Sequence, residues 1–591
     1  MLLGGSAAAA ADDVRSTTGL VKWVRQGSDY GYDPAQPVHY TSASTEQVMI
    51  PDMYETPRSE FRAAWVPTVN QISVAKPQDR SDFQRQYSGI LDRFDALKLN
   101  AMIFQVRPAG DAWYPSALNP WSQYLAPAQG QDPGYDPLAW MIEQTHARNM
   151  EYHAWFNPFR VTATPITTAS VLAALDLTAD EARSLTAAQA VARYAEKGLL
   201  SADNYAVAHP ERVLLFNGML LLDPGLPEVR EHVVASVLEV AERYDVDGVH
   251  LDDYFYPYRT ATTFGDAGED RATFEAHGLS AGYADTADGI AQWRRDNVTA
   301  LIRGIHDGIE AVNAERGTRI EFGVSPFGIW EHRSVDPRGS DTPASSSSTY
   351  SKAVFADTYR WVKEELVDYI VPQLYWSFDQ AAAPYGELAR WWDGVVAGTD
   401  VRLYIGHANY KHVQNGPSDP SWTNPDEIPN QVLFNQTLPN VSGDVYYGYN
   451  DLIPSSITGL DGAVLAAAQA KNGFIERVFG GFYADRVPTP AQAERATPTP
   501  SPSPTPSPSP TARPTATPSA PGGANSGSAG GTAGAGSVEA GHPDGRGTGA
   551  LASTGAPDPA LGGALAALGL GAGAALLLIS LRRRRSRVAA R

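Results

Sequence analysis

Short β-like runs alternate with longer helical patterns along most of this 591-residue chain. The expected strands are residues 61–69, 101–107, 151–157, 248–253, 321–327, 369–376, 402–408 and 444–449. The expected helices are residues 82–97, 137–148, 227–243, 290–314, 353–365, 385–396, 426–438 and 462–471. Strict alternation of strands and helices favours a parallel α/β architecture. Eight strands with eight helices predict a (β/α)₈ TIM barrel. A doubly wound open sheet is the structural alternative, but no Gly-rich phosphate loop follows the first strand.

Changes of composition divide the chain into five predicted segments. They are a signal-peptide remnant or disordered arm (1–19), an N-terminal wrap (20–58), the barrel (59–485), a disordered linker rich in Pro/Ser/Thr and then Gly/Ala (486–550), and a C-terminal segment (551–591). Inside the barrel, residues 161–226 form a long insertion after the third strand. It should contain helices near 170–175 and 179–197 and a hairpin with an Asn217-Gly218 turn. Such insertions usually shape the rim of an active site.

The C-terminal segment carries targeting information. Leu551-Ala552-Ser553-Thr554-Gly555 precedes an apolar run at 561–581 and four arginines at 582–585. The run is about long enough to span a bilayer as a transmembrane helix, and the arginines would hold its end in the cytoplasm. This arrangement resembles the cell-wall sorting signal of Gram-positive bacteria, in the Leu-Ala-x-Thr-Gly variant of actinobacteria. The resemblance implies that a sortase cuts after Thr554 and that the protein is extracellular and wall-anchored. An ordinary C-terminal membrane anchor is the alternative.

Composition narrows the possible partners. The chain has no Cys and a formal net charge of −20. Disulfides and thiolate metal sites are therefore excluded, and an acidic surface argues against nucleic acid as a partner. No cofactor is expected.

The strand at 248–253 ends at two adjacent carboxylates, Asp252 and Asp253, and aromatic residues follow it. Because strand side chains alternate between faces, His250 and Asp252 share one side. Two acids at the end of an apolar strand are costly unless they are solvated, paired or catalytic. We therefore predict that Asp252 and Asp253 are the catalytic residues.

Polar and aromatic residues recur at alternate positions where the other strands end. In a barrel these ends converge on one mouth, where amides and aromatic rings suit a polysaccharide or oligosaccharide. The predicted substrate-binding residues at strand ends are Gln105, Arg107, Trp155, Asn157, His250, Tyr254, Gln373, Tyr375, Trp376, His407 and Asn409.

Glycoside hydrolysis normally needs one protonated carboxyl group and a second as nucleophile or base. Adjacent like charges raise one pKa, but sequence neighbours cannot lie on either side of the scissile bond at a conventional separation. Two options remain open. In one, the 2-acetamido group of the substrate is the nucleophile, one Asp orients it and the other protonates the leaving oxygen. In the other, Asp252 works with a distant acid such as Glu331, Asp111 or Asp336.

A metal hydrolase is the alternative chemistry. Its ligands would have to come from His153, His250, His407, Asp252 and Asp253, but no His-x-x-x-His or comparable ligand spacing occurs. No metal site is predicted.

Several motifs follow one another in a fixed order between residues 58 and 450. They are Phe61-Arg62-Ala63-Ala64-Trp65-Val66, Gln105-Val106-Arg107-Pro108, Ala154-Trp155-Phe156-Asn157-Pro158, Leu222-Asp223-Pro224-Gly225, Tyr244 to Pro257, Gly323 to Trp330, and Pro372-Gln373-Leu374-Tyr375-Trp376. This series resembles glycosyl-hydrolase-like family ten, and it adds Arg62 to the substrate-binding candidates. The resemblance implies a barrel related to the α-amylase type and a glycosidase acting on O-glycosyl bonds. A bacterial outer-membrane member cleaves peptidoglycan strands stripped of stem peptides, which implies an N-acetylated cell-wall glycan as the substrate.

The resemblance assigns roles unevenly. In the amylase-like pattern the acid of Gly-x-x-x-Asp on the fourth strand is the nucleophile, and Asp252 matches that position. The acid/base would end the fifth strand, where this chain has Ser325-Pro326-Phe327 and no acid before Glu331. This departure favours the acetamido-assisted option. A catalytically silent carbohydrate-binding or adhesion protein, an α-glucan hydrolase and a transglycosidase are the functional alternatives.

Overall fold

The computed structural model describes residues 15–258, 268–351 and 353–496. The predicted linker beyond residue 496, the motif Leu551–Gly555 and the apolar run at 561–581 lie outside these residues. Within the described ranges, no helix combines the length and the apolar character that a membrane crossing requires.

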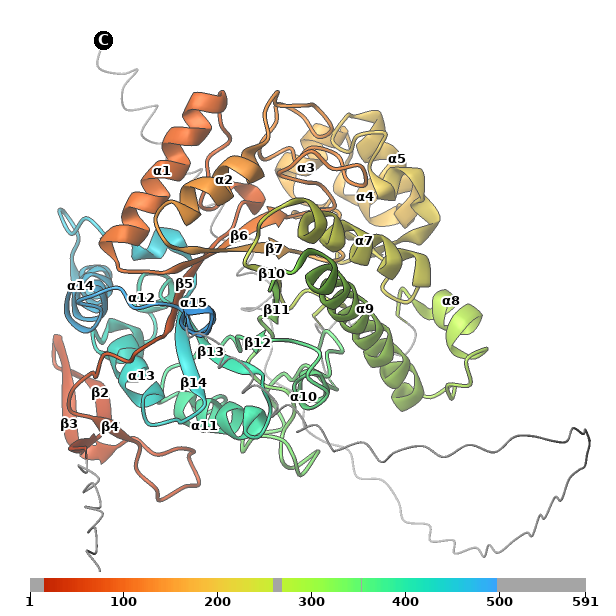
Figure 1. The fold of residues 1–591 in the computed structure, drawn as a ribbon. Helices are drawn as coiled ribbons and strands as arrows, with labels where there is room; N and C mark the ends of the chain where they lie inside the picture. Colours follow the sequence, from red (N-terminus) through yellow and green to blue (C-terminus); the bar gives the residue numbers. More distant parts are fainter. Residues whose placement is uncertain (1–14, 259–267, 352, 497–591) are drawn as a thin grey trace, which may run out of the picture.

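Eight parallel strands close into a barrel, as predicted. Each is hydrogen-bonded to the next in chain order, and the last, β14, pairs with the first, β5. Figure 1 shows the ring that they form. The strands are β5 (Phe61–Val66), β6 (Ala101–Arg107), β7 (Glu151–Phe156), β10 (Gly248–Leu251), β11 (Glu321–Val324), β12 (Tyr369–Ile370), β13 (Arg402–His407) and β14 (Val441–Tyr446).

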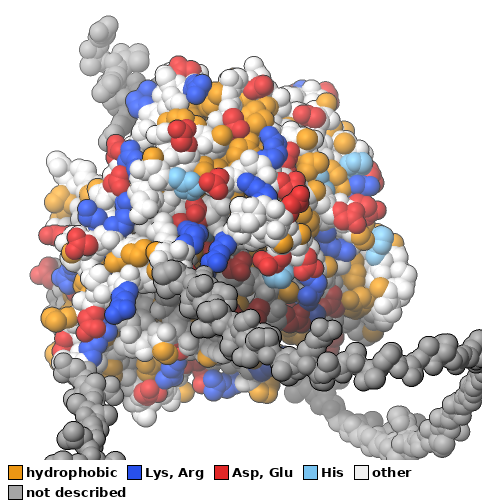
Figure 2. Space-filling model, viewed as in Figure 1, with side chains coloured by type: hydrophobic (Ala, Val, Ile, Leu, Met, Phe, Trp, Pro, Cys, Tyr) orange, Lys and Arg blue, Asp and Glu red, His pale blue; other side chains and the backbone are white. Residues whose placement is uncertain are grey.

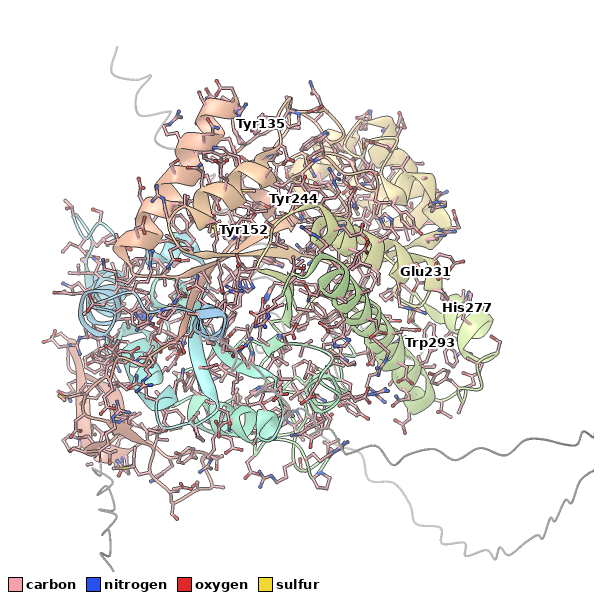
Figure 3. The ribbon with its side chains drawn as sticks, viewed as in Figure 1. Tyr135, Tyr152, Glu231, Tyr244, His277 and Trp293 are labelled. Atoms are coloured by element: carbon pink, nitrogen blue, oxygen red, sulfur yellow. The ribbon has the colours of Figure 1, made fainter. Side chains whose placement is uncertain are left out.

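A helix follows each strand and covers the outside of the barrel (Figure 1). These helices are α1 (Arg80–Ala96), α2 (Pro137–His146), α7 (Pro227–Arg243), α9 (Ala287–Arg316), α10 (Thr358–Lys363), α11 (Tyr385–Val396), α13 (Glu427–Asn435) and α14 (Gly462–Arg477). Helix α2 shows why they form where the sequence predicts. The Asp136 carboxylate accepts a hydrogen bond from Ala139 N at 3.1 Å, and Pro137 opens the first turn. Tyr152 and Tyr244, labelled in Figure 3, lie between the barrel and this helix layer, and the Tyr244 hydroxyl donates to Asp136 at 2.8 Å.

Some barrel strands end earlier than predicted because a proline follows. The run expected at 369–376 is a strand only to Ile370, and the run expected at 321–327 ends at Val324. Pro372 and Pro326 have no N–H to donate, so regular pairing stops there. Beyond the prolines, Gln373 still bridges Phe327 on one side and Gly406 on the other. The segment after Pro372 therefore stays in its place in the barrel, but its side chains no longer alternate strictly between the two faces.

The insertion after β7 has helices α3 (Ala169–Leu175), α4 (Ala179–Ser184) and α5 (Ala187–Glu196) and a hairpin of β8 (Val213–Phe216) and β9 (Met219–Leu222). The helix expected at 179–197 is two helices, because the Thr186 side chain caps a new helix instead of continuing the first. The hairpin is confirmed: Asn217 and Gly218 both have positive φ, 49° and 77°, as a two-residue turn of type I′ requires. Hydrogen bonds from Val161 N and Thr162 N to Leu220 O, at 3.0 and 3.1 Å, attach the hairpin to the loop after β7. The insertion therefore lies at the mouth of the barrel.

The N-terminal wrap consists of two small antiparallel pairs. β1 (Thr17–Gly19) pairs with β4 (Met49–Pro51), and β2 (Val21–Gln26) pairs with β3 (Asp29–Pro37). The pair β2–β3 stands beside α13 in Figure 1. Trp23 Nε1 donates to Thr423 Oγ1 at 3.1 Å, which fixes this pair to the segment before α13.

Aromatic side chains fill the inside of the barrel. Phe61 and Tyr404 stack with their ring centroids 4.2 Å apart, and Trp65, Trp155 and Tyr369 belong to the same buried cluster. The interior is therefore a packed core and not a channel, as in other barrels of this kind. The aromatic cluster therefore leaves no room for a ligand in the middle of the barrel.

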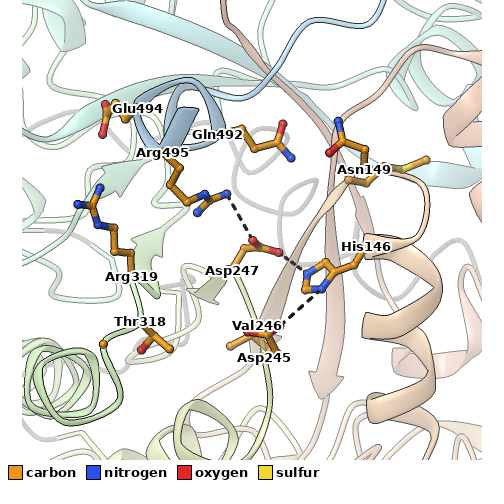
Figure 4. Close-up of a pocket in the computed structure, with 12 residues that line it drawn as sticks. His146, Asn149, Asp245, Val246, Asp247, Thr318, Arg319, Gln492, Glu494 and Arg495 are labelled. Atoms are coloured by element: carbon orange, nitrogen blue, oxygen red, sulfur yellow. Dashed lines mark hydrogen bonds and ion pairs between the residues drawn. The ribbon is translucent and has the colours of Figure 1, made fainter. Parts of the chain in front are cut away.

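A short helix, α15 (Pro490–Ala496), lies at the N-terminal end of the barrel, over its axis in Figure 1. Its Arg495 pairs with the buried Glu151 carboxylate at 2.6 Å and lies 3.6 Å from Asp247 (Figure 4). Thr489 Oγ1 donates to the same Glu151 oxygen at 2.7 Å. The packed fold thus continues past residue 485 and uses α15 to neutralise a carboxylate buried under the barrel floor.

A cavity of about 610 Å³ opens beside α15 (Figure 4). Asp245 and Asp247, which precede β10, line it together with His146. His146 Nε2 lies 2.8 Å from Asp247 Oδ2, and Tyr152 N donates to the same oxygen at 2.9 Å. This end of the molecule, the face seen in Figure 2, carries interspersed positive and negative side chains. His146 and Asp247 in the wall of this cavity thus already bind one another.

We expect the ion pair between Arg495 and Glu151 to stabilise the folded protein. Arg495→Met removes the charged partner of a carboxylate that is only 1% exposed, so we expect a loss of about 1–3 kcal/mol in the free energy of unfolding. Arg333→Met is the matched control, because Arg333 and its partner Asp341 are both about half exposed and such pairs contribute about 0–1 kcal/mol. Urea unfolding of both variants measures the difference. Equal losses would show that α15 does not stabilise the barrel through Glu151.

Candidate active site

A cavity of about 280 Å³ opens at the other end of the barrel, where β6, β7 and β10 end. Asp252 lies in its wall, and the hairpin β8–β9 supplies the apolar side facing the strand ends. The cavity is therefore polar towards the barrel and apolar towards the insertion. The polar and aromatic residues of its lining include Gln105, Trp155, Asn157, Arg160, Asp252, Tyr254, Tyr258 and Tyr447.

Asp252 is 4% exposed and held by three donors. Trp155 Nε1 and Asn157 Nδ2 donate to its Oδ2 at 3.1 and 2.9 Å, and Tyr254 N donates to its Oδ1 at 3.3 Å. Burial raises the pKa of Asp252, whereas the charge of Arg160 and the donors from Asn157 and Trp155 act in the opposite direction. These donors are aimed at the ionised form of the carboxylate.

Asp253 is 5% exposed and has a different environment. The Tyr258 hydroxyl donates to its Oδ2. Burial, and then the neighbouring Asp252 charge, raise the pKa of Asp253 to about 7. Because the donors from β7 stabilise Asp252 as the anion, Asp253 is the member of the pair that holds a proton near neutral pH.

His250 lies below the pair, inside the barrel. Its Nε2 lies 3.2 Å from Trp65 Nε1 and 2.9 Å from Ser325 Oγ, and its Nδ1 lies 3.2 Å from the Tyr369 hydroxyl. An indole N–H can only donate, so Nε2 accepts and Nδ1 carries the proton. Burial lowers the pKa of His250 well below its usual value. His250 is therefore a neutral side chain. Its hydrogen bonds connect Trp65, Ser325 and Tyr369 beneath the acidic pair, and it is neither an acid nor a base.

Gln105 presents one unused donor. Its Oε1 accepts hydrogen bonds from Thr68 N and Val69 N at 3.1 and 3.0 Å, which fixes the orientation of the amide. The Nε2 atom is buried and has no partner in the described part of the chain. A ligand in the cavity would need an acceptor oxygen to satisfy it.

Three further predicted residues lie on the β12 side of the mouth. Gln373 Nε2 donates to Ser325 O at 2.8 Å, and its side chain also lowers the pKa of Asp253. Tyr375 stacks with Tyr447, with centroids 6.0 Å apart, and Trp376 packs edge-on against Phe327 at 5.2 Å. This side of the mouth is thus built mainly of aromatic rings.

The structure does not bring Arg62, Arg107 or His407 to the cavity. Arg62 alternates with inward-facing Phe61 and Ala63, so it lies outside the barrel, 2.5 Å from Glu60 and over the Tyr483 ring. Pairing between β6 and β7 shifts register between residues 105 and 107, and Arg107 binds Asn157 O at 2.8 Å.

The misplacement of His407 has a similar cause. Tyr404 faces the barrel core, so His407 is on the opposite side of β13 and bonds to Asp444 at 2.7 Å and to Gln431 of α13 at 3.0 Å. Asn409 donates to Gly448 O at 3.0 Å, and its buried Oδ1 has no partner among the described residues.

Several lining residues were not predicted as site residues, among them Arg160, Tyr258 and Tyr447. Arg160 follows Asn157 by three positions, and Tyr258 follows the acidic pair by five. Tyr447 directly follows β14, and its ring is close enough to both acids for their charges to raise its pKa. Only Tyr447 had a usable signal, since it lies at the end of an expected strand; the other two come from loops.

The distant acids proposed as partners of Asp252 lie in separate environments. Glu331 is fully buried and accepts from His332 N at 2.9 Å, and Asp111 accepts from Ala109 N at 3.1 Å. Asp336 pairs with Arg338 at 2.7 Å. Within the described residues, none of the three forms a hydrogen bond with Asp252 or Asp253.

The five candidate metal ligands do not converge within the described ranges. The group there with a suitable spacing is Glu151, His153 and Glu321, at the opposite end of the barrel. Arg495 pairs with Glu151 and Arg402 pairs with Glu321, so arginine already neutralises both carboxylates. These residues form an ion-pair network rather than an open metal site.

Comparison with known proteins agrees with the geometry. A family model described as "Glycosyl hydrolase-like 10" matches residues 60–424. Glycosyl hydrolase YngK of Bacillus subtilis (strain 168) is 39% identical over 395 residues, which cover 66% of this chain and 69% of that protein. Glycosyl hydrolase DigH of Escherichia coli (strain K12) is 36% identical over 392 residues, which cover 65% of this chain and 80% of that protein.

Among solved structures, the PgaB (BpsB) glycoside hydrolase domain from Bordetella bronchiseptica is similar at 12% identity, with a TM-score of 0.41. That match covers 66% of this chain and 94% of that domain. So distant a similarity supports no inference about function.

The raised pKa of Asp253 gives a prediction about folding. The folded protein holds this proton up to about pH 7, whereas the unfolded chain releases it near pH 4, so folded protein binds more protons between these values. Stability therefore falls as the pH rises through this window, and the cost remains above pH 7. We expect Asp253→Asn to be more stable than the unchanged protein at pH 8, by on the order of 2–4 kcal/mol, and the gain to shrink towards pH 4.

Urea unfolding at pH 4, 6 and 8 measures this gain. Asp180→Asn is the matched control, because the Asp180 side chain is 96% exposed. A variant that is destabilised at every pH would contradict the assignment of the proton to Asp253.

Proposed function

Because this chain belongs to the glycosyl hydrolase-like 10 family, we propose that it hydrolyses O-glycosyl bonds of a polysaccharide at the mouth of its barrel. The observation that carries the proposal is the unequal environment of Asp252 and Asp253. One carboxylate is surrounded by donors, and the other has a pKa raised to about 7. Two carboxyl groups whose surroundings separate their pKa values are what acid/base catalysis of glycoside cleavage requires.

The pair divides the work of catalysis as follows. Asp253 protonates the leaving glycosidic oxygen, because it still holds its proton near neutral pH. Asp252 remains the anion and stabilises the positive charge that develops on the sugar. Trp155 and Asn157 hold the Asp252 carboxylate in place, so little reorganisation is needed during the reaction.

The substrate we propose is an N-acetylated cell-wall glycan of the peptidoglycan type. Neighbouring residues on one strand cannot lie on either side of a glycosidic bond at the separation of about 5–10 Å that conventional pairs use. A 2-acetamido group on the sugar supplies the missing nucleophile, and Asp252 orients it. The apolar wall of the β8–β9 hairpin, with Phe216 and Leu221 among its lining residues, offers a surface for the acetamido methyl group.

We also propose that the protein is exported and anchored to a Gram-positive cell wall. The support is the sequence of residues 551–591, in which a sortase would cut between Thr554 and Gly555 after the run at 561–581 had entered the membrane. The place of α15 suits this role, because the last described helix lies at the barrel end opposite the cavity. A tether that continues from that end would leave the mouth free to meet the glycan.

The test uses the purified full-length chain with denuded peptidoglycan, N-acetylated and non-acetylated oligosaccharides, and α-glucans. We expect cleavage of acetamido substrates, with kcat/KM reduced about 10²–10⁴-fold in both Asp252→Asn and Asp253→Asn. The rate should fall as the pH rises through about 7, because Asp253 loses its proton there, and Asp253→Asn should lack that limb. Mass spectrometry of the products measures the cleavage.

Other outcomes would redirect the proposal. Cleavage of α-glucans alone would identify an α-glucan hydrolase. Binding of glycans without cleavage would identify a carbohydrate-binding or adhesion protein. Cleavage of non-acetylated substrates that survives Asp253→Asn would pair Asp252 with a remote acid.

A further inference from the structure

Arg160 is held in the cavity wall by several independent contacts. Its N–H donates to Asn157 Oδ1 at 3.1 Å, and its backbone bridges to Leu221 of the hairpin. Its guanidinium donates to Pro108 O at 3.2 Å and lies 4.7 Å above the ring of Tyr254. The guanidinium group of Arg160 is thus held in position before any ligand binds.

Arg160 forms no ion pair with any residue that the structure describes. Among the described residues that line the cavity, Arg160 is the only cation and Asp252 is the only anion. No carboxylate of the described chain lies within ion-pair distance of Arg160, although its charge does lower the pKa of Asp252. Some buried arginines are ion-paired, as Arg62 is with Glu60 and Arg294 with Asp270, whereas buried Arg107 donates to the carbonyl groups of Asn157 and Pro158 instead.

A guanidinium has five N–H donors, and the described chain satisfies one N–H of this one. A half-buried cation without an ion-paired carboxylate can gain a favourable interaction from an anionic ligand. We propose that Arg160 is the receptor for a carboxylate carried by the glycan, so that the enzyme prefers acidic sugars to neutral ones. The inference rests on the proposed glycosidase function and adds the charge of its substrate.

Geometry favours a carboxylate over other polar groups. The planar guanidinium fork matches the two oxygens of a carboxylate, and stacking on Tyr254 leaves its edge as the binding direction. The same cavity contains the unused Nε2 donor of Gln105, which also needs an acceptor oxygen. Every unsatisfied polar atom identified in this wall is therefore a donor.

The electrostatics of the site point the same way. A substrate anion placed beside Asp252 would raise the pKa of that carboxylate and oppose its ionised role. Arg160 offsets this effect, because it lowers the pKa of Asp252 and attracts the substrate anion at once. The net charge of −20 repels acidic glycans only weakly at a distance, since salt screens exposed charges beyond about 8 Å at 0.15 M ionic strength.

A glycan can carry this carboxylate in two ways, as a lactyl ether on an amino sugar or as the C6 carboxyl group of a uronic acid. The experiment uses the full-length chain and oligosaccharides of both kinds, each compared with the same molecule whose carboxyl group is converted to the primary amide. The preferred pair identifies the source. We expect kcat/KM for the free acid to exceed that for the amide by about 10–100-fold, the usual range for a charge-assisted contact.

Arg160→Gln should bring the ratio of acid to amide close to one, whereas Arg160→Lys should keep part of it. The ratio isolates recognition of the carboxylate, because any effect of the substitution on Asp252 acts on both substrates. Arg183→Gln, in an exposed pair on α4 of the same insertion, is the matched control and should leave the ratio unchanged. Thermal unfolding of each variant shows whether it is folded.

Calorimetric binding of the same acid and amide pairs to the unchanged protein separates the two proposals. If no glycan is cleaved, the proposed hydrolase function fails, but tighter binding of the acid that Arg160→Gln abolishes would still support the inference. If glycans are cleaved with equal kcat/KM for acid and amide, or if Arg160→Gln keeps the preference, the inference is overturned and the hydrolase function stands.

Discussion

The burial of two adjacent carboxylates at the end of β10 is the constraint on which the mouth of this barrel depends. An ionised carboxylate that leaves water must find donors, and two of them side by side cannot both remain charged at low cost. The chain satisfies Asp252 from β7, through Trp155 and Asn157, and leaves Asp253 with a proton. The same constraint that threatens stability therefore separates the two acids into unequal chemical roles.

The opposite end of the barrel meets a similar problem with a different result. Glu151 is buried under the barrel floor, and Arg495 of α15 neutralises it. That contact is closed, since Thr489 and Arg495 both bind the carboxylate, whereas at the mouth Arg160 forms no ion pair and Gln105 Nε2 has no partner within the described chain. Aromatic packing separates the two ends. At the N-terminal end of the barrel, other parts of the chain thus satisfy the buried carboxylate. At the mouth, polar groups remain available to a ligand.

The sequence predicted all eight barrel strands and the helices between them because hydrophobic periodicity records which side chains are buried. It also predicted that Asp252 and Asp253 lie together where β10 ends, since a charged pair that ends an apolar strand conflicts with that pattern. It misplaced Arg107 because the pairing of β6 with β7 shifts register between residues 105 and 107. It misplaced His407 because Tyr404 faces the barrel core, which puts His407 on the outer face of β13. Neither feature can be read from the amino-acid composition. It missed Arg160 and Tyr258 because they come from loops, where no period relates sequence position to direction.

The residue at the end of β11 bears on the roles that we propose for Asp252 and Asp253, which follow β10. In the amylase-like pattern this position would carry an acid, and here it is Ser325, whose hydroxyl lies 2.9 Å from His250 Nε2. A carboxylate at that position would bring a negative charge against an acceptor nitrogen that already receives the Trp65 N–H. The neutral, buried His250 is therefore compatible with a serine and not with an ionised acid. In the function that we propose, β11 supplies no acid at its end, and the proton donor is Asp253, the buried carboxyl group whose pKa is raised to about 7.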